Sequence, residues 1–170
     1  MRSLVWTTLA MLALASGCAQ DGAGRPGDRS LLVKALYGSG QCGGLERPAV
    51  VWIADPEAWR RWYGRVVSLR MTPPPPPPVD FPREGVLLVA MGQRPSSGYG
   101  LSLAGESTAV RDGVLTVRVD WREPPPGYRQ AQVMTSPCLL ALLSAASFTR
   151  MQILDQEGRV RLEGVRSPAE

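Results

Sequence analysis

Apolar residues are grouped along the chain into short runs separated by glycine- and proline-rich segments, a pattern typical of a protein built from β-strands. Residues 86–91 and 138–143 are continuous apolar runs, which indicate buried strands. Residues 114–121 alternate between apolar and other side chains, which indicates a strand with one buried face. The same patterns predict further strands at residues 31–37, 48–53, 99–103, 131–134, 148–154 and 159–163.

One segment carries helical signals instead. Asp55 is a good N-cap residue, and Pro56 suits the first helical position. Three aromatic side chains then follow with the spacing i, i+3, i+4, which places them on one helical face. They are Trp59, Trp62 and Tyr63. We interpret this face as core packing rather than a ligand-binding site, and we predict a helix over about 55–64 that ends at Gly64.

These elements predict a mostly β protein, an antiparallel β-sandwich or barrel with one short helix packed on it. We assign residues 31–163 to a single β-rich domain. A domain of this size can bury a real core, so it requires neither a metal nor many disulfides. Residues 164–170 are polar and are expected to form a tail.

The segment between the strands at 86–91 and 99–103 is rich in turn-forming residues. Its tip reads Arg94, Pro95, Ser96, Ser97, Gly98 and Tyr99. One interpretation is an ordinary hairpin with a polar loop. The other is a recognition loop, because arginine and tyrosine supply contact area and small residues let a partner backbone approach. Tyr99 begins a strand, so a core position is also open to it.

The residues of this loop resemble the C-terminal domain of the PrcB family. The resemblance rests on a strand ending in Gly-x-Arg-Pro, a small-residue pair and then Gly-Tyr. It continues upstream in Val79-Asp80-Phe81 and Glu84, and downstream in Pro124–Gly127, Gln132-Val133 and Thr135-Ser-Pro137. It covers roughly residues 79–143, with weaker similarity from about 47. Ser97 stands where the family often has glycine, and Cys138 stands where it often has an aromatic residue.

PrcB proteins are lipoproteins associated with the stability of an extracellular protease complex. The resemblance therefore implies a non-catalytic protein whose partner is a secreted or surface protease. We expect the Arg94–Tyr99 loop to bind this partner, with Pro124–Gly127 and Thr135–Cys138 beside it. The loop is also similar, over a few residues, to that of chagasin-like protease inhibitors. The alternative function is a structural or carbohydrate-binding envelope protein in which the loop only maintains the fold.

The N-terminus has the features of a bacterial lipoprotein signal. A basic start is followed by an apolar run from Leu4 to Leu14, which is shorter than a membrane span of about 20 residues requires. Small residues then precede Cys18. We predict a signal peptide over 1–17, lipidation of Cys18 and a flexible tether over 18–30. Because alanine follows Cys18, we expect an anchor in the outer membrane that faces the periplasm.

Two cysteines remain after Cys18, namely Cys42 and Cys138. Cysteines of an exported protein often pair, so we predict a disulfide between them, the alternative being two buried free thiols. Residues 73–78 are consecutive prolines, which favour an extended polyproline II conformation. We interpret them as a stiff connector, the alternative being a docking site for an aromatic groove.

The amino-acid composition limits the reactions that the protein could catalyse. The chain contains no histidine, which excludes Ser-His-Asp and Cys-His catalysis and histidine-bound metals. No residues assemble into a recognisable catalytic motif, so we predict no enzyme activity, no cofactor and no metal. The formal charge is +4, but the arginines are scattered among acids. Nucleic-acid binding needs a clustered basic patch, so we do not expect it.

Overall fold

The computed structural model describes residues 29–127 and 129–166. Within these residues the chain forms nine strands and one helix. The helix is α1 (Pro56–Val66). The strands are β1 (Arg29–Ser39), β2 (Ala49–Ile53), β3 (Glu84–Ala90), β4 (Gly100–Leu103), β5 (Ser107–Arg111), β6 (Val114–Arg122), β7 (Cys138–Ser144), β8 (Arg150–Leu154) and β9 (Val160–Val165).

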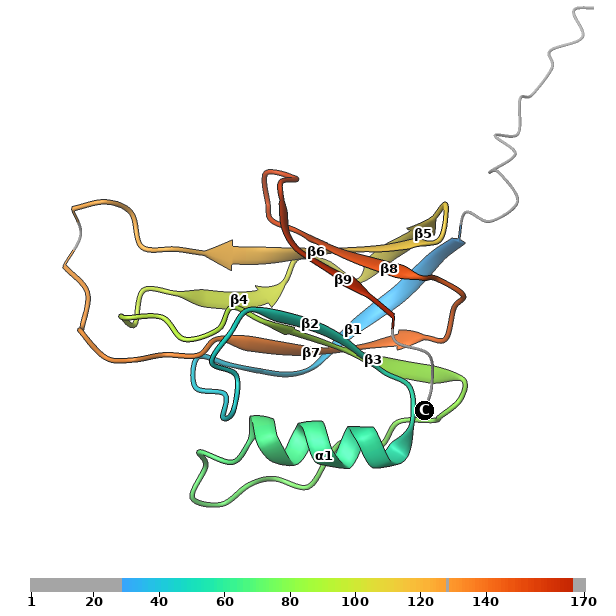
Figure 1. Cartoon of the computed structure of the whole chain (residues 1–170), viewed down its shortest axis with the longest axis horizontal. Helices are drawn as coiled ribbons and strands as arrows, with labels where there is room; N and C mark the ends of the chain where they lie inside the picture. Colours follow the sequence, from blue (N-terminus) through green and yellow to red (C-terminus); the bar gives the residue numbers. More distant parts are fainter. Residues whose placement is uncertain (1–28, 128, 167–170) are drawn as a thin grey trace, which may run out of the picture.

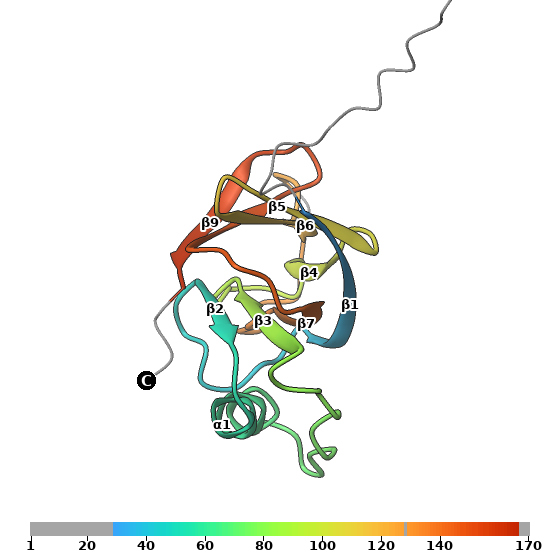
Figure 2. The ribbon, with the colours of Figure 1, turned by 90° about the vertical axis from the view of Figure 1, so that its right-hand side faces the viewer.

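All nine strands belong to one sheet that curls into a nearly closed barrel (Figure 1, Figure 2). The order is β2-β3-β7-β1-β5-β6-β8-β9, and β4 pairs with β6 beside this path. The pairings are antiparallel except that of β6 with β8. The two ends of the sheet approach each other, since a Cβ on Gly164 of β9 would lie 2.6 Å from Val50 of β2. The prediction of a mostly β barrel or sandwich with one helix is confirmed.

The central strands β3 and β7 are buried on both faces, which explains their unbroken apolar sequences. In β3, Leu87 and Val89 point into the barrel interior, whereas Val86 and Leu88 point toward the helix. The interior is completed by the alternating apolar side of β6, as predicted. That side consists of Leu115, Val117, Val119 and Trp121.

Helix α1 covers the outside of the barrel next to β2 and β3 (Figure 2). It begins as the sequence predicts, since the Asp55 carboxylate accepts a hydrogen bond of 2.8 Å from the backbone N–H of Ala58. The predicted end at Gly64 is wrong, because the helix continues to Val66. Val66 and Val67 are buried almost completely, and this packing outweighs the weak helix propensity of one glycine.

The predicted strand at 131–134 is also wrong. These residues are exposed and form no strand, and the nearest β-bridges are isolated ones at Thr135 and Ser136. A strand pattern without a neighbouring strand forms no ladder. At the two ends of the domain, β1 starts at Arg29 within the predicted tether, and β9 runs to Val165 within the predicted tail.

Cys42 and Cys138 form a disulfide, which confirms the predicted pair. It joins the loop after β1 to the first residue of β7, so that two segments far apart in sequence are fixed side by side. The predicted signal peptide, Cys18 and the predicted tether up to residue 28 lie outside the described residues. In the described part of the chain no helix has the length and apolar character needed to cross a membrane.

Candidate functional site

Four connecting segments lie together at one end of the barrel, which we call the loop end (the left side of Figure 1). They comprise residues 40–48, 67–74, 92–99 and 123–137, of which residue 128 is not described. The first residue of β1, Arg29, lies at the opposite end (Figure 1). The predicted recognition loop, Arg94–Tyr99, is therefore on the part of the domain that lies farthest from the start of β1.

The Arg94–Tyr99 loop is fixed by the irregular segment before β7. Arg94 and Thr135 exchange two backbone hydrogen bonds, each of 2.8 Å. The Thr135 hydroxyl also donates to the Ser96 carbonyl at 2.9 Å, and both of these side chains are buried. Farther along the loop, the Ser97 N–H donates to the Ala131 carbonyl at 3.1 Å. The loop thus has a defined backbone path rather than projecting freely from the sheet.

The base of the loop is equally constrained. Gly92 has a φ of +76°, and a Cβ there would lie 2.7 Å from the backbone nitrogen of Pro48. The next residue, Gln93, donates its N–H to the Glu46 carbonyl at 3.0 Å. At the other end of the loop, Gly98 lies directly against Pro124. Glycine is required at both positions by close approach to neighbouring chain.

The side chains of the loop divide between inward and outward positions. The Arg94 guanidinium lies 5.4 Å from the ring centroid of Tyr99, close enough for a cation–π contact. Tyr99 is half-buried and packs against the barrel core, so it contributes to the fold as well as to the loop surface. Pro95 and Ser97 are exposed. The outward surface of the loop therefore consists of these two residues and the exposed parts of Arg94, Gly98 and Tyr99.

This part of the chain matches a known protein family. Residues 86–143 match the PrcB C-terminal family model. This confirms the expected family resemblance, which the sequence pattern placed over roughly 79–143. Neither a curated protein nor a solved structure matches the chain.

The matched residues, 86–143, which we call the PrcB C-terminal segment, begin in β3 and end in β7. It therefore contains the Arg94–Tyr99 loop and the segment at 124–137 that holds it. The expectation that Pro124–Gly127 and Thr135–Cys138 lie beside the loop agrees with the structure, since Pro124 contacts Gly98 and Thr135 pairs with Arg94. The roles of these residues in binding remain a prediction.

A hollow beside the loop could not be recognised in the sequence. This hollow, of 230 Å³, is lined by Gln93 and Met134 of the PrcB C-terminal segment, together with Leu69 from the segment after α1. A larger adjoining hollow, of 630 Å³, shares Leu69 and adds Arg70 and Met71. The contributing residues come from distant parts of the chain and form no motif, so only the fold brings them together.

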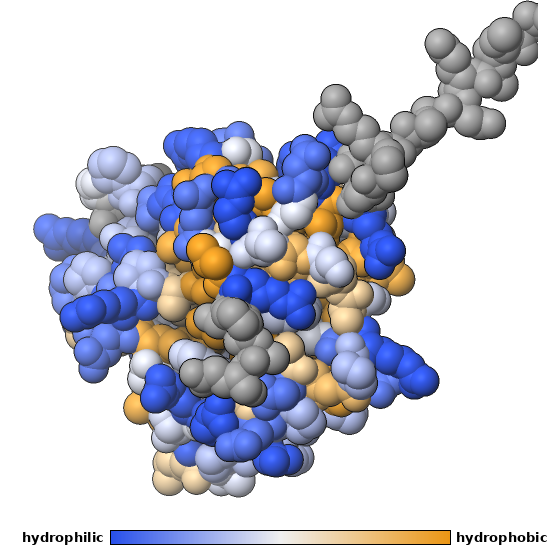
Figure 3. Space-filling view, turned by 45° about the vertical axis from the view of Figure 1, so that its right-hand side comes forward, coloured by the Kyte–Doolittle hydropathy of each residue, from blue (hydrophilic) through white to orange (hydrophobic). Residues whose placement is uncertain are grey.

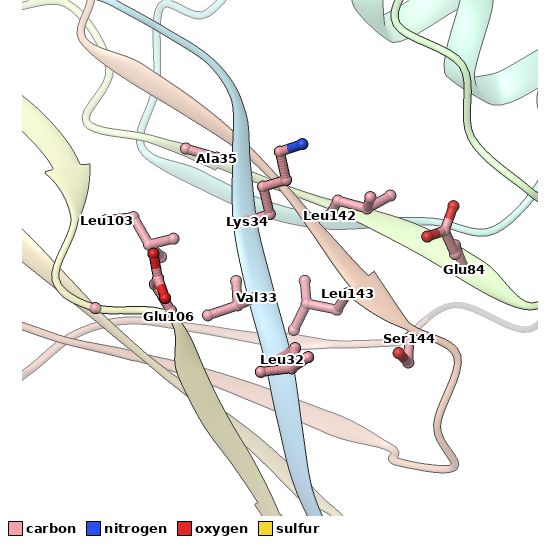
Figure 4. A pocket seen from close by; sticks show the side chains of 11 residues that line it. Leu32, Val33, Lys34, Ala35, Glu84, Leu103, Glu106, Leu142, Leu143 and Ser144 are labelled. Atoms are coloured by element: carbon pink, nitrogen blue, oxygen red, sulfur yellow. The ribbon is translucent and has the colours of Figure 1, made fainter.

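A different hollow, of 660 Å³, contains the chain's single lysine (Figure 4). Lys34 makes no ion pair among the described residues, and Glu84 and Glu106 lie on opposite sides of β1. The carboxylates are therefore not paired for acid–base catalysis. The described residues also contain no group of three histidine, cysteine or acidic side chains that could hold a metal ion.

The buried Asp155 carboxylate at the turn between β8 and β9 is structural. Burial by itself raises the pKa of this carboxyl, but hydrogen bonds from the Arg159 backbone and guanidinium and from the Glu157 N–H outweigh it and lower the pKa. The guanidinium bond is 2.9 Å long, and Arg161 lies 3.6 Å from the same oxygen. Because every contact is made within one turn and its strand, this cluster fixes the hairpin rather than a ligand.

Proposed function

We propose that this protein is a non-catalytic envelope lipoprotein that binds a protein partner through the Arg94–Tyr99 loop. The match to the PrcB C-terminal family points in general terms to a lipoprotein associated with a protease complex. We propose that the partner is a secreted or surface protease, which the protein stabilises or restrains.

The observation that carries this proposal is the position of the loop. It belongs to the PrcB C-terminal segment and lies at the end of the barrel opposite Arg29. If Cys18 carries a lipid, as we propose, the chain leaves the membrane and enters the domain at Arg29, and the loop then faces away from the anchor. Such a position favours capture of a partner.

The loop also has the physical properties of a recognition surface. Its backbone is held by hydrogen bonds to Thr135 and Ala131, so little conformational entropy is lost when a partner binds. Arg94 and Tyr99 are stacked, and Pro95 and Ser97 are exposed next to them. Arginine and tyrosine are enriched among the residues that dominate binding energy at protein interfaces.

Site-directed photo-cross-linking tests the proposal in the full-length lipoprotein. A photoreactive amino acid replaces Ser97 in one variant and Ser147, which is also exposed but lies outside the loop end, in another. After irradiation of intact cells, we expect a protein cross-link from position 97 that is absent from position 147, and mass spectrometry should identify a protease. No product at 97, or the same products at both positions, would instead support a structural or carbohydrate-binding role.

A further inference from the structure

We propose that the loop end binds an acidic segment of the partner that also carries an apolar side chain. In this arrangement the apolar side chain enters the hollow between Leu69 and Met134, and the carboxylates contact the surrounding arginines. This inference rests on the proposed function, because it specifies the chemistry of the partner.

The loop end exposes several apolar side chains. Four large apolar side chains are exposed at the loop end. They are Leu69 (64% exposed), Met71 (103%), Val133 (48%) and Met134 (59%). Leu69 lines both hollows, and Met134 lines the smaller one, so two of these side chains border a shared depression. Figure 3 brings forward the side of the barrel opposite the loop end, where hydrophobic residues are scattered among hydrophilic ones.

Two arginines lie at this depression, and two more are next in sequence to residues that line it. Arg70 lines the larger hollow, and Arg65 packs directly against Gly44, which lines the smaller one. Arg47 and Arg94 follow Glu46 and Gln93, which are also lining residues. Among the described residues, Glu46 is the one charged residue that lines the smaller hollow, whereas Arg70 lines the larger hollow and Arg65 lies against Gly44, so over the two hollows together positive charge exceeds negative.

These arginines are not neutralised within the protein. In the described part of the chain, none of Arg47, Arg65, Arg70 and Arg94 forms an ion pair. Elsewhere arginines are paired, for example Arg159 with Asp155 at 2.9 Å. The Nε of Arg94 is buried without a hydrogen-bond partner, which leaves this guanidinium under-satisfied.

Aromatic rings orient three of the guanidinium groups. Arg65 lies over Trp62 at 5.1 Å, Arg70 over Tyr37 at 5.9 Å, and Arg94 over Tyr99 at 5.4 Å. Stacking on a ring fixes the position of a guanidinium without removing its charge, and a guanidinium can bind a carboxylate through two parallel hydrogen bonds. The arrangement therefore favours a carboxylate-bearing partner over a neutral or basic one.

The floor of the depression is rigid. The Cys42–Cys138 disulfide and the hydrogen bond of 2.8 Å from the Ser136 hydroxyl to the Leu45 carbonyl join its two sides. The Gln41 side chain donates to the Met134 carbonyl at 3.1 Å and holds the rim. A preformed depression with fixed charges suits an extended segment that enters it with little rearrangement of the protein.

Peptide binding tests the proposal with the purified full-length protein in a neutral detergent. The probe is a short fluorescein-labelled peptide in which leucines alternate with aspartates and glutamates. The comparison peptides replace either the leucines with serine or the acids with lysine. We expect a rise in anisotropy with the first peptide, binding that weakens as salt is raised, and binding at least about tenfold weaker for both comparison peptides.

Two protein variants identify the binding surface. We expect Arg47→Glu/Arg70→Glu to weaken binding of the acidic-apolar peptide by about tenfold and Leu69→Ser to weaken it severalfold. The control is Arg150→Glu, which reverses the charge of an exposed arginine at the start of β8. All four altered positions are exposed, so the melting temperature should hardly change in any variant, and a circular dichroism melt checks this.

Each other outcome would overturn the proposal. Equal binding of the serine peptide would indicate a general affinity for polyanions, including acidic polysaccharides, without the apolar contact. Unchanged binding by the arginine variant would place the peptide elsewhere. A cross-link from position 97 combined with no peptide binding would overturn this inference while leaving the proposed function intact.

Discussion

Arg94 and Thr135 lie 41 positions apart in the sequence yet exchange both of their backbone hydrogen bonds, each 2.8 Å long. This isolated bridge joins the loop after β3 to the segment that leads into β7. Its effect is to fix the Arg94–Tyr99 loop by contact with a segment that has no regular secondary structure of its own.

The Thr135 hydroxyl should contribute strongly to the connection between these two segments. Thr135→Val leaves the Ser96 carbonyl without its buried donor, and we expect the free energy of unfolding to fall by about 1–3 kcal/mol. Thr135→Ser keeps the donor and should retain most of the stability. Urea denaturation of both variants measures the difference. Equal losses in the two variants would show that packing of the threonine methyl group, rather than the hydrogen bond, is the important contribution.

A methyl group at Gly98 should displace the loop. Its carbon would lie 2.7 Å from the Cβ of Pro124, so Gly98→Ala requires movement of the chain and should destabilise the protein by about 1–3 kcal/mol. Gly64→Ala is the matched control, because Gly64 lies in the last turn of α1 and nothing lies within 4 Å of the added carbon. That variant should gain about 0.5–1 kcal/mol. Thermal melts with the same sign for both variants would refute the steric argument.

The disulfide should contribute strongly to stability. Cys42 and Cys138 are 96 positions apart, and closing a loop of this size in the unfolded chain is worth up to about 4–5 kcal/mol. We expect Cys42→Ala/Cys138→Ala to lower the free energy of unfolding toward that extent, and reduction of the natural protein to have a similar effect. Guanidinium denaturation with and without reductant checks this. Reductant should not affect the double variant, and a response there would point to another cause.

Acid should weaken the hairpin between β8 and β9. In the folded protein the pKa of Asp155 is below its ordinary value of 3.8, so its stabilising contribution is complete above that pH and is lost as the pH falls through the folded-state pKa. Asp155→Asn should therefore flatten the pH dependence of unfolding below about pH 4. Urea denaturation across this range measures the slope. Glu106→Gln, which alters an exposed carboxylate, is the control, and parallel profiles for Asp155→Asn and the natural protein would contradict the expectation.

Cys18 is predicted to carry the lipid anchor. Metabolic labelling of cells with a clickable fatty acid should mark the natural protein, and Cys18→Ala should abolish the label. The remaining cysteines are joined to each other and so provide no alternative acceptor. A label that persists in the Cys18→Ala variant would show that the N-terminal segment has been misinterpreted.

Most strands and the helix start could be predicted because their signals are local, whereas β5 was not predicted and the strand predicted at 131–134 is absent. The continuous apolar residues of β3 and β7 reflect burial on both faces, and Asp55 caps α1 through its own side chain. The helix end could not be predicted from Gly64, because the deciding interaction is burial of Val66 against distant strands. Propensity is a weak signal where tertiary packing decides.

The same distinction applies to the candidate site. The Arg94–Tyr99 loop is continuous in sequence and carries the family's residue pattern, so it could be predicted. The hollow beside it could not, because Leu69 and Met134 are 65 positions apart and neither belongs to a motif. Likewise, the scattered sequence positions of the arginines do not show that Arg65, Arg70 and Arg94 each stack on an aromatic ring, since the ring under Arg70 is that of Tyr37, 33 positions away.

The direction of β1 determines how the domain responds to mechanical force. Its first residues pair with β5 and its later residues pair with β7, while the strand runs from the Arg29 end toward the loop end (Figure 1). A pull between Arg29 and a partner held at the loop end acts along this strand. The force then acts as shear on many of the hydrogen bonds between β1 and its neighbours at once. It does not open these bonds one at a time from an edge of the sheet. If Cys18 carries a lipid and the loop end holds a partner, as we propose, this geometry should help the barrel to stay folded under tension between the two.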